Sequence, residues 1–203
     1  MKKKVILWIM QTQLYRWLLL KIVPFIRFKT YYTTLRGNKY HEAYKHLRPG
    51  DVVLGVDRSK LTTFLIPGEL SHAGFCVGRM DGKNPGFEIA EMTHHGFTKS
   101  MFFDFCKEAD RVVIMRCPNV DEDYIERMIA RCLSFDKAKY DLMFAFGIED
   151  LYCSEMVYDS DEERRFGAST EDLVGLDQEY ISPMGLYHAD NLFAAWDTDW
   201  QGS

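Results

Sequence analysis

The stretch that decides the fold is LYCSEMVY, residues 151–158, in which a cysteine precedes a Ser-Glu pair at the start of an apolar helical pattern. Free cysteine is among the residue types most often buried, so Cys153 fits a small core side chain. It also fits a nucleophile, because the unpaired N–H groups and the positive dipole end of a helix N-terminus favour a thiolate. The rest of the chain must decide between these two roles.

A nucleophilic thiolate needs an imidazole that pairs with it and later returns a proton to the leaving group. The six histidines are His41, His46, His72, His94, His95 and His188. His72 differs from the others because it enters the apolar strand predicted in SHAGFCVGRM, residues 71–80, next to the small residues Ala73 and Gly74. A histidine on a strand is more often structural than catalytic, so spacing alone leaves its role open.

The pattern around these two residues predicts an α+β layout. A Pro-Gly-Asp turn leads into a strand at 52–56, and the strands at 71–80 and 87–92 form a hairpin. Residues 97–111 read as a loop with a short helix at 102–107, followed by a strand at 112–116. Asp121 caps an amphipathic helix, and a second core helix starts near Cys153. An antiparallel sheet packed on helices is therefore expected.

Composition and charge exclude several classes of protein. The chain has 203 residues, 47% of them hydrophobic and 27% charged, which suits one well-packed domain with an appendage. A net charge of -5 argues against broad binding to nucleic acid. Five cysteines form no C-x-x-C pair, so free thiols are expected rather than disulfides or a zinc ribbon. They are Cys76, Cys106, Cys117, Cys132 and Cys153.

The N-terminal segment MKKKVILWIMQTQLYRWLLLKIVPF, residues 1–25, predicts an amphipathic helix with a wide apolar face. Arg16 and Lys21 disfavour a spanning helix, and a signal peptide lacks its small-residue cleavage site. Two alternatives stay open: an interfacial helix that holds residues 1–26 at a membrane surface, or a helix packed on its own domain or a partner subunit. Pro24 is expected to end or kink the helix.

Five motifs, PGDVVLG, SHAGFCVG, EMTHHGF, KYDLMF and LYCSEMVY, occur in an order that resembles the YiiX/YebB-like branch of the NlpC-type papain-fold cysteine hydrolases. The resemblance covers residues 47–190. Here the cysteine follows Asp51 and His72, whereas ordinary NlpC-type peptidases place it first. The resemblance therefore implies a circularly permuted papain-like fold, which is tolerable because domain termini commonly lie close together at the surface.

The resemblance implies a catalytic triad. It makes Cys153 the nucleophile, His72 the general base and acid, and Glu91 the acidic third member. Glu88 stays open as an alternative, and strand alternation places the two glutamates on opposite faces, so both cannot serve. The backbone N–H of Cys153 is the natural oxyanion donor, and a neighbouring tyrosine, Tyr152 or Tyr140, could supply a second one.

A metal site is the competing chemistry. Glu88, Glu91, His94 and His95 lie close in the sequence, but their spacing matches neither an H-E-x-x-H helix nor a cysteine-based zinc pattern. We therefore predict no metal and no cofactor.

The expected domains are an N-terminal amphipathic helix and connector (1–46), a hydrolase domain (47–190) and an acidic tail (191–203), mobile from Asp197 onward. The resemblance implies a thiol hydrolase that forms an acyl-enzyme on an amide or ester, as an amidase or endopeptidase of cell-wall-type peptides such as peptidoglycan stems. A lipid-directed acyl hydrolase or acyltransferase and a non-catalytic scaffold are the alternatives. The expected location is cytoplasmic or peripheral to a membrane.

Overall fold

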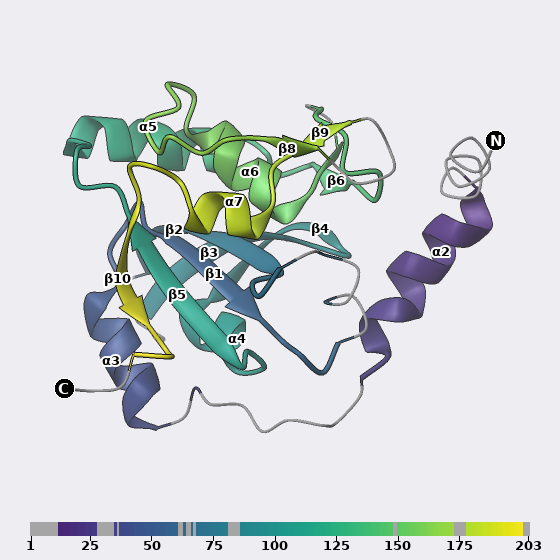
Figure 1. Cartoon of the computed structure of the whole chain (residues 1–203), viewed down its shortest axis with the longest axis horizontal. Coiled ribbons are helices and arrows are strands. Elements are labelled where there is room, and N and C mark those ends of the chain that lie inside the picture. The colour runs from purple at the N-terminus through teal and green to yellow at the C-terminus, as the bar shows by residue number, and fades with distance from the viewer. Residues whose placement is uncertain are drawn as a thin grey trace.

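A computed structural model of the chain describes residues 12–27, 35, 37–60, 63, 66, 68–80, 86–147, 150–172 and 178–200. A six-stranded sheet lies at its centre, with the strand order β10-β5-β1-β2-β3-β4 (Figure 1). All neighbouring strands run antiparallel. The strands are β1 (Val52–Val56), β2 (His72–Met80), β3 (Gly86–Thr93), β4 (Gly96–Met101), β5 (Arg111–Arg116) and β10 (Phe193–Asp197).

Helices cover both faces of the sheet (Figure 1). One face packs on α5 (Glu122–Leu133), α6 (Cys153–Ser160) and α7 (Pro183–Tyr187), and the other on α3 (Asn38–His46) and α4 (Phe102–Cys106). Strand β1 reads VVLGV, and its alternation sends Val52 and Leu54 into the first core and Val53 into the second. Because β1 is buried on both sides, it carries no polar side chain.

The two core helices begin where the sequence predicts them. The Asp121 carboxylate accepts a hydrogen bond from the backbone N–H of Tyr124 at 2.7 Å and so caps α5. Tyr124, Met128 and Cys132 form its buried face, at the predicted helical spacing. Helix α6 starts at Cys153 itself, after the short parallel pair β6 (Lys139–Tyr140) and β7 (Asp150–Leu151). A second short pair, β8 (Glu171–Asp172) and β9 (Glu179–Tyr180), precedes α7.

Strand β4 differs from the prediction, which placed a loop at residues 97–101. It pairs with β3 from Thr93↔Gly96 to Glu88↔Met101, across a turn formed by His94 and His95. Gly96 has a φ of +92°, and a Cβ there would lie 2.6 Å from the carbonyl oxygen of Ala138. Glycine is therefore required at this position, and the hairpin partner rather than local pattern makes residues 97–101 extended.

The predicted mobility of the chain from Asp197 onward is wrong for residues 197–199. Asp197 ends the edge strand β10, and its carboxylate accepts hydrogen bonds from Nε and Nη2 of Arg111 at 3.1 and 2.7 Å. Thr198 is fully buried, and its hydroxyl contacts the backbone N–H and carbonyl of Val112, each at 2.9 Å. Asp197, one of the acidic residues of this segment, thus forms a buried ion pair with Arg111. The domain boundaries at residues 46 and 190 stay a prediction.

The N-terminal region contains a helix, α2 (Gln13–Lys21), which Thr12 caps and which ends before the 3-10 turn η1 (Val23–Phe25). That turn holds Pro24, which agrees with the predicted end of the helix. Residues 1–11 of the predicted helix lie outside the described residues. Across the ranges that the structure describes, every helix is too short or too polar to cross a bilayer.

Replacing Asp197 with Ala is expected to destabilise the protein by roughly 3–5 kcal/mol, because it leaves a largely buried guanidinium without its bidentate partner. Asp199→Ala is the matched control, since Asp199 is 54% exposed and lies 3.2 Å from the same Arg111, and its loss should cost less than about 1 kcal/mol. Urea unfolding measures both. Equal effects of the two substitutions would contradict the structural role of Asp197.

Candidate active site

Cys153 is the first residue of α6 and lies where this helix packs on β2. It is 2% exposed, and burial by itself raises the pKa of its thiol. A hydrogen bond with His72 and N–H donors from the backbone of Ala73 and Ser154 outweigh that effect and hold the pKa below its ordinary value. The helix N-terminus adds its positive dipole end. The environment therefore favours the thiolate.

His72 opens β2, opposite Gly55 of β1. Its Nε2 lies 2.7 Å from Oε2 of Glu91, so Nδ1 is the ring nitrogen left for the sulfur of Cys153. Burial by itself lowers the pKa of His72, but the hydrogen bonds to Cys153 and Glu91 prevail and raise it to about 10. The shifts of the two groups therefore favour a thiolate paired with an imidazolium.

Phe105 also contacts the imidazole, and no pattern in the sequence predicts this contact. Its ring stacks on His72 with centroids 5.4 Å apart. A Cβ on Gly74 would lie 3.0 Å from this ring, and one on Gly55 would lie 3.3 Å from it. Gly55 and Gly74 thus leave room for the aromatic ring that packs on the histidine.

Glu91 lies on β3 directly opposite Gly74 of β2. One carboxylate oxygen contacts His72, and the other accepts a hydrogen bond from the hydroxyl of Ser100. Burial by itself raises the pKa of Glu91, but the bond to His72 outweighs it and the pKa is lowered. Glu88, the alternative, pairs instead with Lys99 at 3.0 Å. The structure thus brings Glu91, and not Glu88, to the imidazole.

Of the two candidate tyrosines, Tyr140 has the hydroxyl whose pKa depends more on the charge of the Cys153 sulfur. Burial and then the charge of Cys153 raise its pKa well above the ordinary value. The hydroxyl of Tyr152 instead accepts a hydrogen bond from the backbone N–H of Ile181 at 2.9 Å, and its side chain is 1% exposed. Tyr152 therefore braces the start of α6, whereas Tyr140 remains the candidate for an oxyanion donor.

Glu155 ties the start of α6 to the loop before it. The carboxyl group is fully buried and accepts hydrogen bonds from the backbone N–H of Gly147 at 2.8 Å and of Tyr152 at 3.3 Å. Asp141 orders the same loop through the N–H groups of Met143 and Ala145. These two carboxyl groups thus fix the backbone that leads into Cys153.

The remaining cysteines are 0–7% exposed, like Cys153. Burial raises the pKa of Cys76 and of Cys106, and it raises that of Cys132 to about 12. Burial alone therefore keeps a thiol protonated, and the imidazole is what distinguishes Cys153.

The residues considered for a metal site are not grouped together. The ring of His94 lies tilted against that of His95 with centroids 3.9 Å apart and forms a T-shaped contact with Phe25, while Glu88 and Glu91 have the partners given above. Within the described ranges, no three His, Cys, Asp or Glu side chains are grouped so as to hold a metal ion.

A cysteine on a helix, a histidine on a strand of an antiparallel sheet and a carboxylate behind it define a papain-like cysteine hydrolase, and the cysteine comes last, as in the permuted form. The sequence matches the profile of the permuted papain-like amidase enzymes, the YaeF/YiiX, C92 family, over residues 46–175. The match spans well over half of the chain, so the protein belongs to this family and is a cysteine peptidase or amidase-like hydrolase.

The fold is also similar to a solved structure, the crystal structure of metalloprotein yiiX from Escherichia coli O157:H7. The TM-score is 0.59 at 18% sequence identity, and the alignment covers 73% of this chain and 96% of that chain. At this identity the likeness shows the fold alone. No curated protein matches the sequence.

Cys153 is expected to react with iodoacetamide at least tenfold faster than the other four cysteines at pH 7, since an ordinary thiol with a pKa of ~8.5 is mostly protonated there. Because the pKa of Cys153 is lowered, its labelling should persist as the pH falls below 8. His72→Ala should slow it. Peptide mapping by mass spectrometry gives the rates, and equal labelling of all five cysteines would count against an activated thiolate.

Glu155 provides a second test. Burial raises its pKa from about 4.5 to about 8, so between these values the folded protein holds a proton that the unfolded chain has lost. Stability should therefore fall as the pH rises from 5 to 8, by at least about 1 kcal/mol relative to Glu155→Gln, which cannot ionise. Urea unfolding of both proteins at several pH values isolates this group. A difference that stays constant with pH would contradict the assignment.

Proposed function

We propose that the protein is a thiol amidase in which Cys153, His72 and Glu91 form the catalytic triad. The observation that carries this proposal is the imidazole, which bonds the sulfur on one side and a buried carboxylate on the other. Family membership supports the class of reaction, a hydrolysis at an amide. The roles of the individual residues rest on the geometry and electrostatics of the site.

In the proposed mechanism the Cys153 thiolate attacks the carbonyl carbon of the amide and forms a tetrahedral intermediate. The His72 imidazolium gives its proton to the leaving nitrogen, the C–N bond breaks, and an acyl-enzyme remains. The neutral imidazole then takes a proton from water, and the resulting hydroxide attacks the thioester and releases the acid. Glu91 fixes the orientation of the ring and stabilises its charge throughout.

Negative charge on the tetrahedral oxygen needs donors beside the sulfur. The backbone N–H of Cys153 at the start of α6 is one, and the hydroxyl of Tyr140 is the second that we propose. The hydroxyl suits this role because its raised pKa keeps it protonated. A phenol that stays neutral can donate a hydrogen bond to an oxyanion.

A peptide amide, as in a peptidoglycan stem, is the substrate that we propose first. Lipid esters or amides form the second candidate, which the exposed apolar side chains of α2 favour. Membrane attachment through residues 1–26 is part of this second proposal.

Intact-mass measurement on protein offered peptidoglycan fragments and phospholipids separately tests both candidates. An acyl adduct that maps to Cys153 and is absent from Cys153→Ala is the expected result, and the fragment that yields it identifies the substrate class. Glu91→Gln should lower kcat/KM on that substrate by roughly 10²–10⁴, because the imidazole loses its orienting carboxylate. Glu88→Gln is the matched control on the same strand and should leave kcat/KM unchanged. Equal losses in the two variants would remove Glu91 from the triad.

A further inference from the structure

The segment before α3 carries a stripe of exposed apolar side chains. Leu14, Trp17, Leu18, Ile22 and Phe25, here called the N-terminal stripe, are 38–73% exposed, and α2 has no buried residue. The spacing i, i+3, i+4 and i+8 places the members from Leu14 to Ile22 along one side of the helix. Helix α2 projects from the domain on the side of β4 and β6 (Figure 1). The stripe thus faces solvent in the part of the chain that the structure describes.

Charge is divided unevenly along the chain. The first 41 residues contain nine lysines and arginines and no acidic residue, whereas all 30 acidic residues follow, with 16 basic ones. On α2, Lys21 lies three and four residues from Leu18 and Trp17, and so within the stripe. Arg16 turns the other way and pairs with Asp150 at 3.8 Å. An apolar face with a tryptophan and a lysine inside a wholly basic segment is complementary to an anionic lipid surface.

The end of the stripe lies beside the candidate active site. The rings of Phe25 and His94 form a T-shaped contact with centroids 5.6 Å apart. His94 belongs to the turn between β3 and β4, three residues after Glu91. The apolar stripe therefore extends from α2 to the hairpin that carries the third member of the triad.

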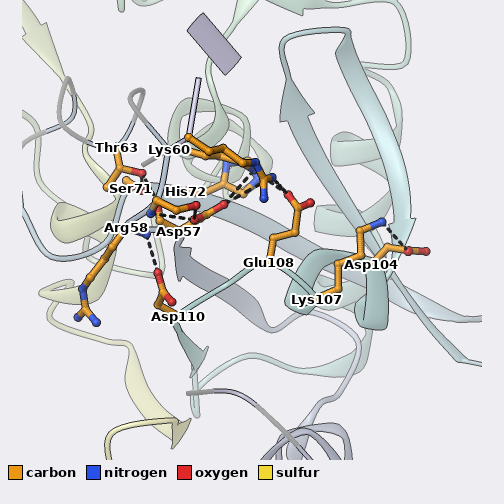
Figure 2. A network of polar contacts seen from close by, with 12 residues as sticks. Asp57, Arg58, Lys60, Thr63, Ser71, His72, Asp104, Lys107, Glu108 and Asp110 are labelled. Carbon is orange, nitrogen blue, oxygen red and sulfur yellow. Dashed lines mark hydrogen bonds and ion pairs between the residues drawn. The ribbon is translucent and has the colours of Figure 1, made fainter. Parts of the chain in front are cut away.

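Ion pairs hold this end of the segment in place. Arg27 forms a backbone bridge with Lys60, and its guanidinium pairs with Glu108 and lies 3.7 Å from Asp57. The ammonium of Lys60 reaches the same two carboxylates at 3.2 and 3.6 Å. Figure 2 shows Asp57, Lys60 and Glu108 of this network together with His72. Gly55 of β1 pairs with His72 of β2, and Asp57 follows Gly55 by two residues. The network is therefore close to the histidine along the chain of β1.

We infer that the N-terminal stripe docks on an anionic lipid bilayer and holds the entrance of the active site at that surface. The substrate is then an amide carried by a membrane-anchored amphiphile, which reaches the imidazole from the lipid side. The inference rests on the proposed amidase function, and it adds that the substrate is held at the lipid surface. With nine residues α2 is about 13 Å long, so it lies in the interface and does not cross it.

Vesicle flotation tests the docking. The full chain is mixed with vesicles of equal parts phosphatidylglycerol and phosphatidylcholine, or of phosphatidylcholine alone. Wild type should float with the anionic vesicles, and Leu14→Ser/Trp17→Ser/Leu18→Ser should bind at least tenfold less. Lys21→Gln, which leaves the apolar residues intact, should bind about fivefold less. The control Phe193→Ser/Trp200→Ser removes apolar side chains that are 46% and 53% exposed elsewhere, and should float like wild type.

Hydrolysis separates this inference from the amidase proposal. One peptide amide is offered free in water and, with a dipalmitoyl anchor, in the anionic vesicles. The triple variant should cleave the free peptide at the wild-type rate and the anchored peptide about tenfold more slowly. Wild type that does not float, or a triple variant that floats equally, overturns the docking while hydrolysis of the free peptide stands. Wild type that cleaves neither peptide overturns the amidase proposal itself.

Discussion

The hydrogen bonds on both sides of the His72 ring are the constraint on which the rest of the structure depends. One bond needs the sulfur at the start of α6 and the other needs the carboxylate of Glu91, and these two groups lie on different elements. The first requires α6 to pack on β2, and the second requires the β2–β3 register that sets Gly74 opposite Glu91. A slip of one residue would turn Glu91 to the other face of the sheet. The site is therefore a product of sheet register and helix packing.

Burial acts against every charged member of this site, so each one depends on its neighbours. Desolvation alone favours the thiol of Cys153, the neutral imidazole of His72 and the protonated carboxyl of Glu91. Together the three invert all of these tendencies, because each charge lies within hydrogen-bond reach of an opposite one. Removal of one partner from such a group leaves an uncompensated buried charge. Cys132, fully buried without an imidazole, shows what the same side chain does alone.

Hydrophobic periodicity in the sequence was sufficient for the β2–β3 hairpin, α5 and the start of α6, because these elements bury one regular face. It missed β4 and β10, whose strands gain their order from a neighbour, β3 or β5, rather than from their own alternation. The resemblance to the family predicted Cys153, His72 and Glu91, but it did not predict the residues that hold these side chains in place. Phe105 contacts His72 from a segment distant in the sequence, and no local pattern marks it. Glu155 lies in the same short helix as Cys153, but its bond to the backbone of Gly147 depends on the path of the preceding loop, which periodicity does not predict.

Access to the site also follows from its construction. Cys153 is 2% exposed, whereas about a third of the His72 side chain is open, so a substrate meets the pair from the side of the imidazole. Arg27 and Phe25 approach that side from the segment before residue 46, where the match to the family begins. The candidate catalytic residues thus lie within the part matched to the family, whereas the contacts of Phe25 and Arg27 beside them come from the basic and apolar N-terminal segment outside that match.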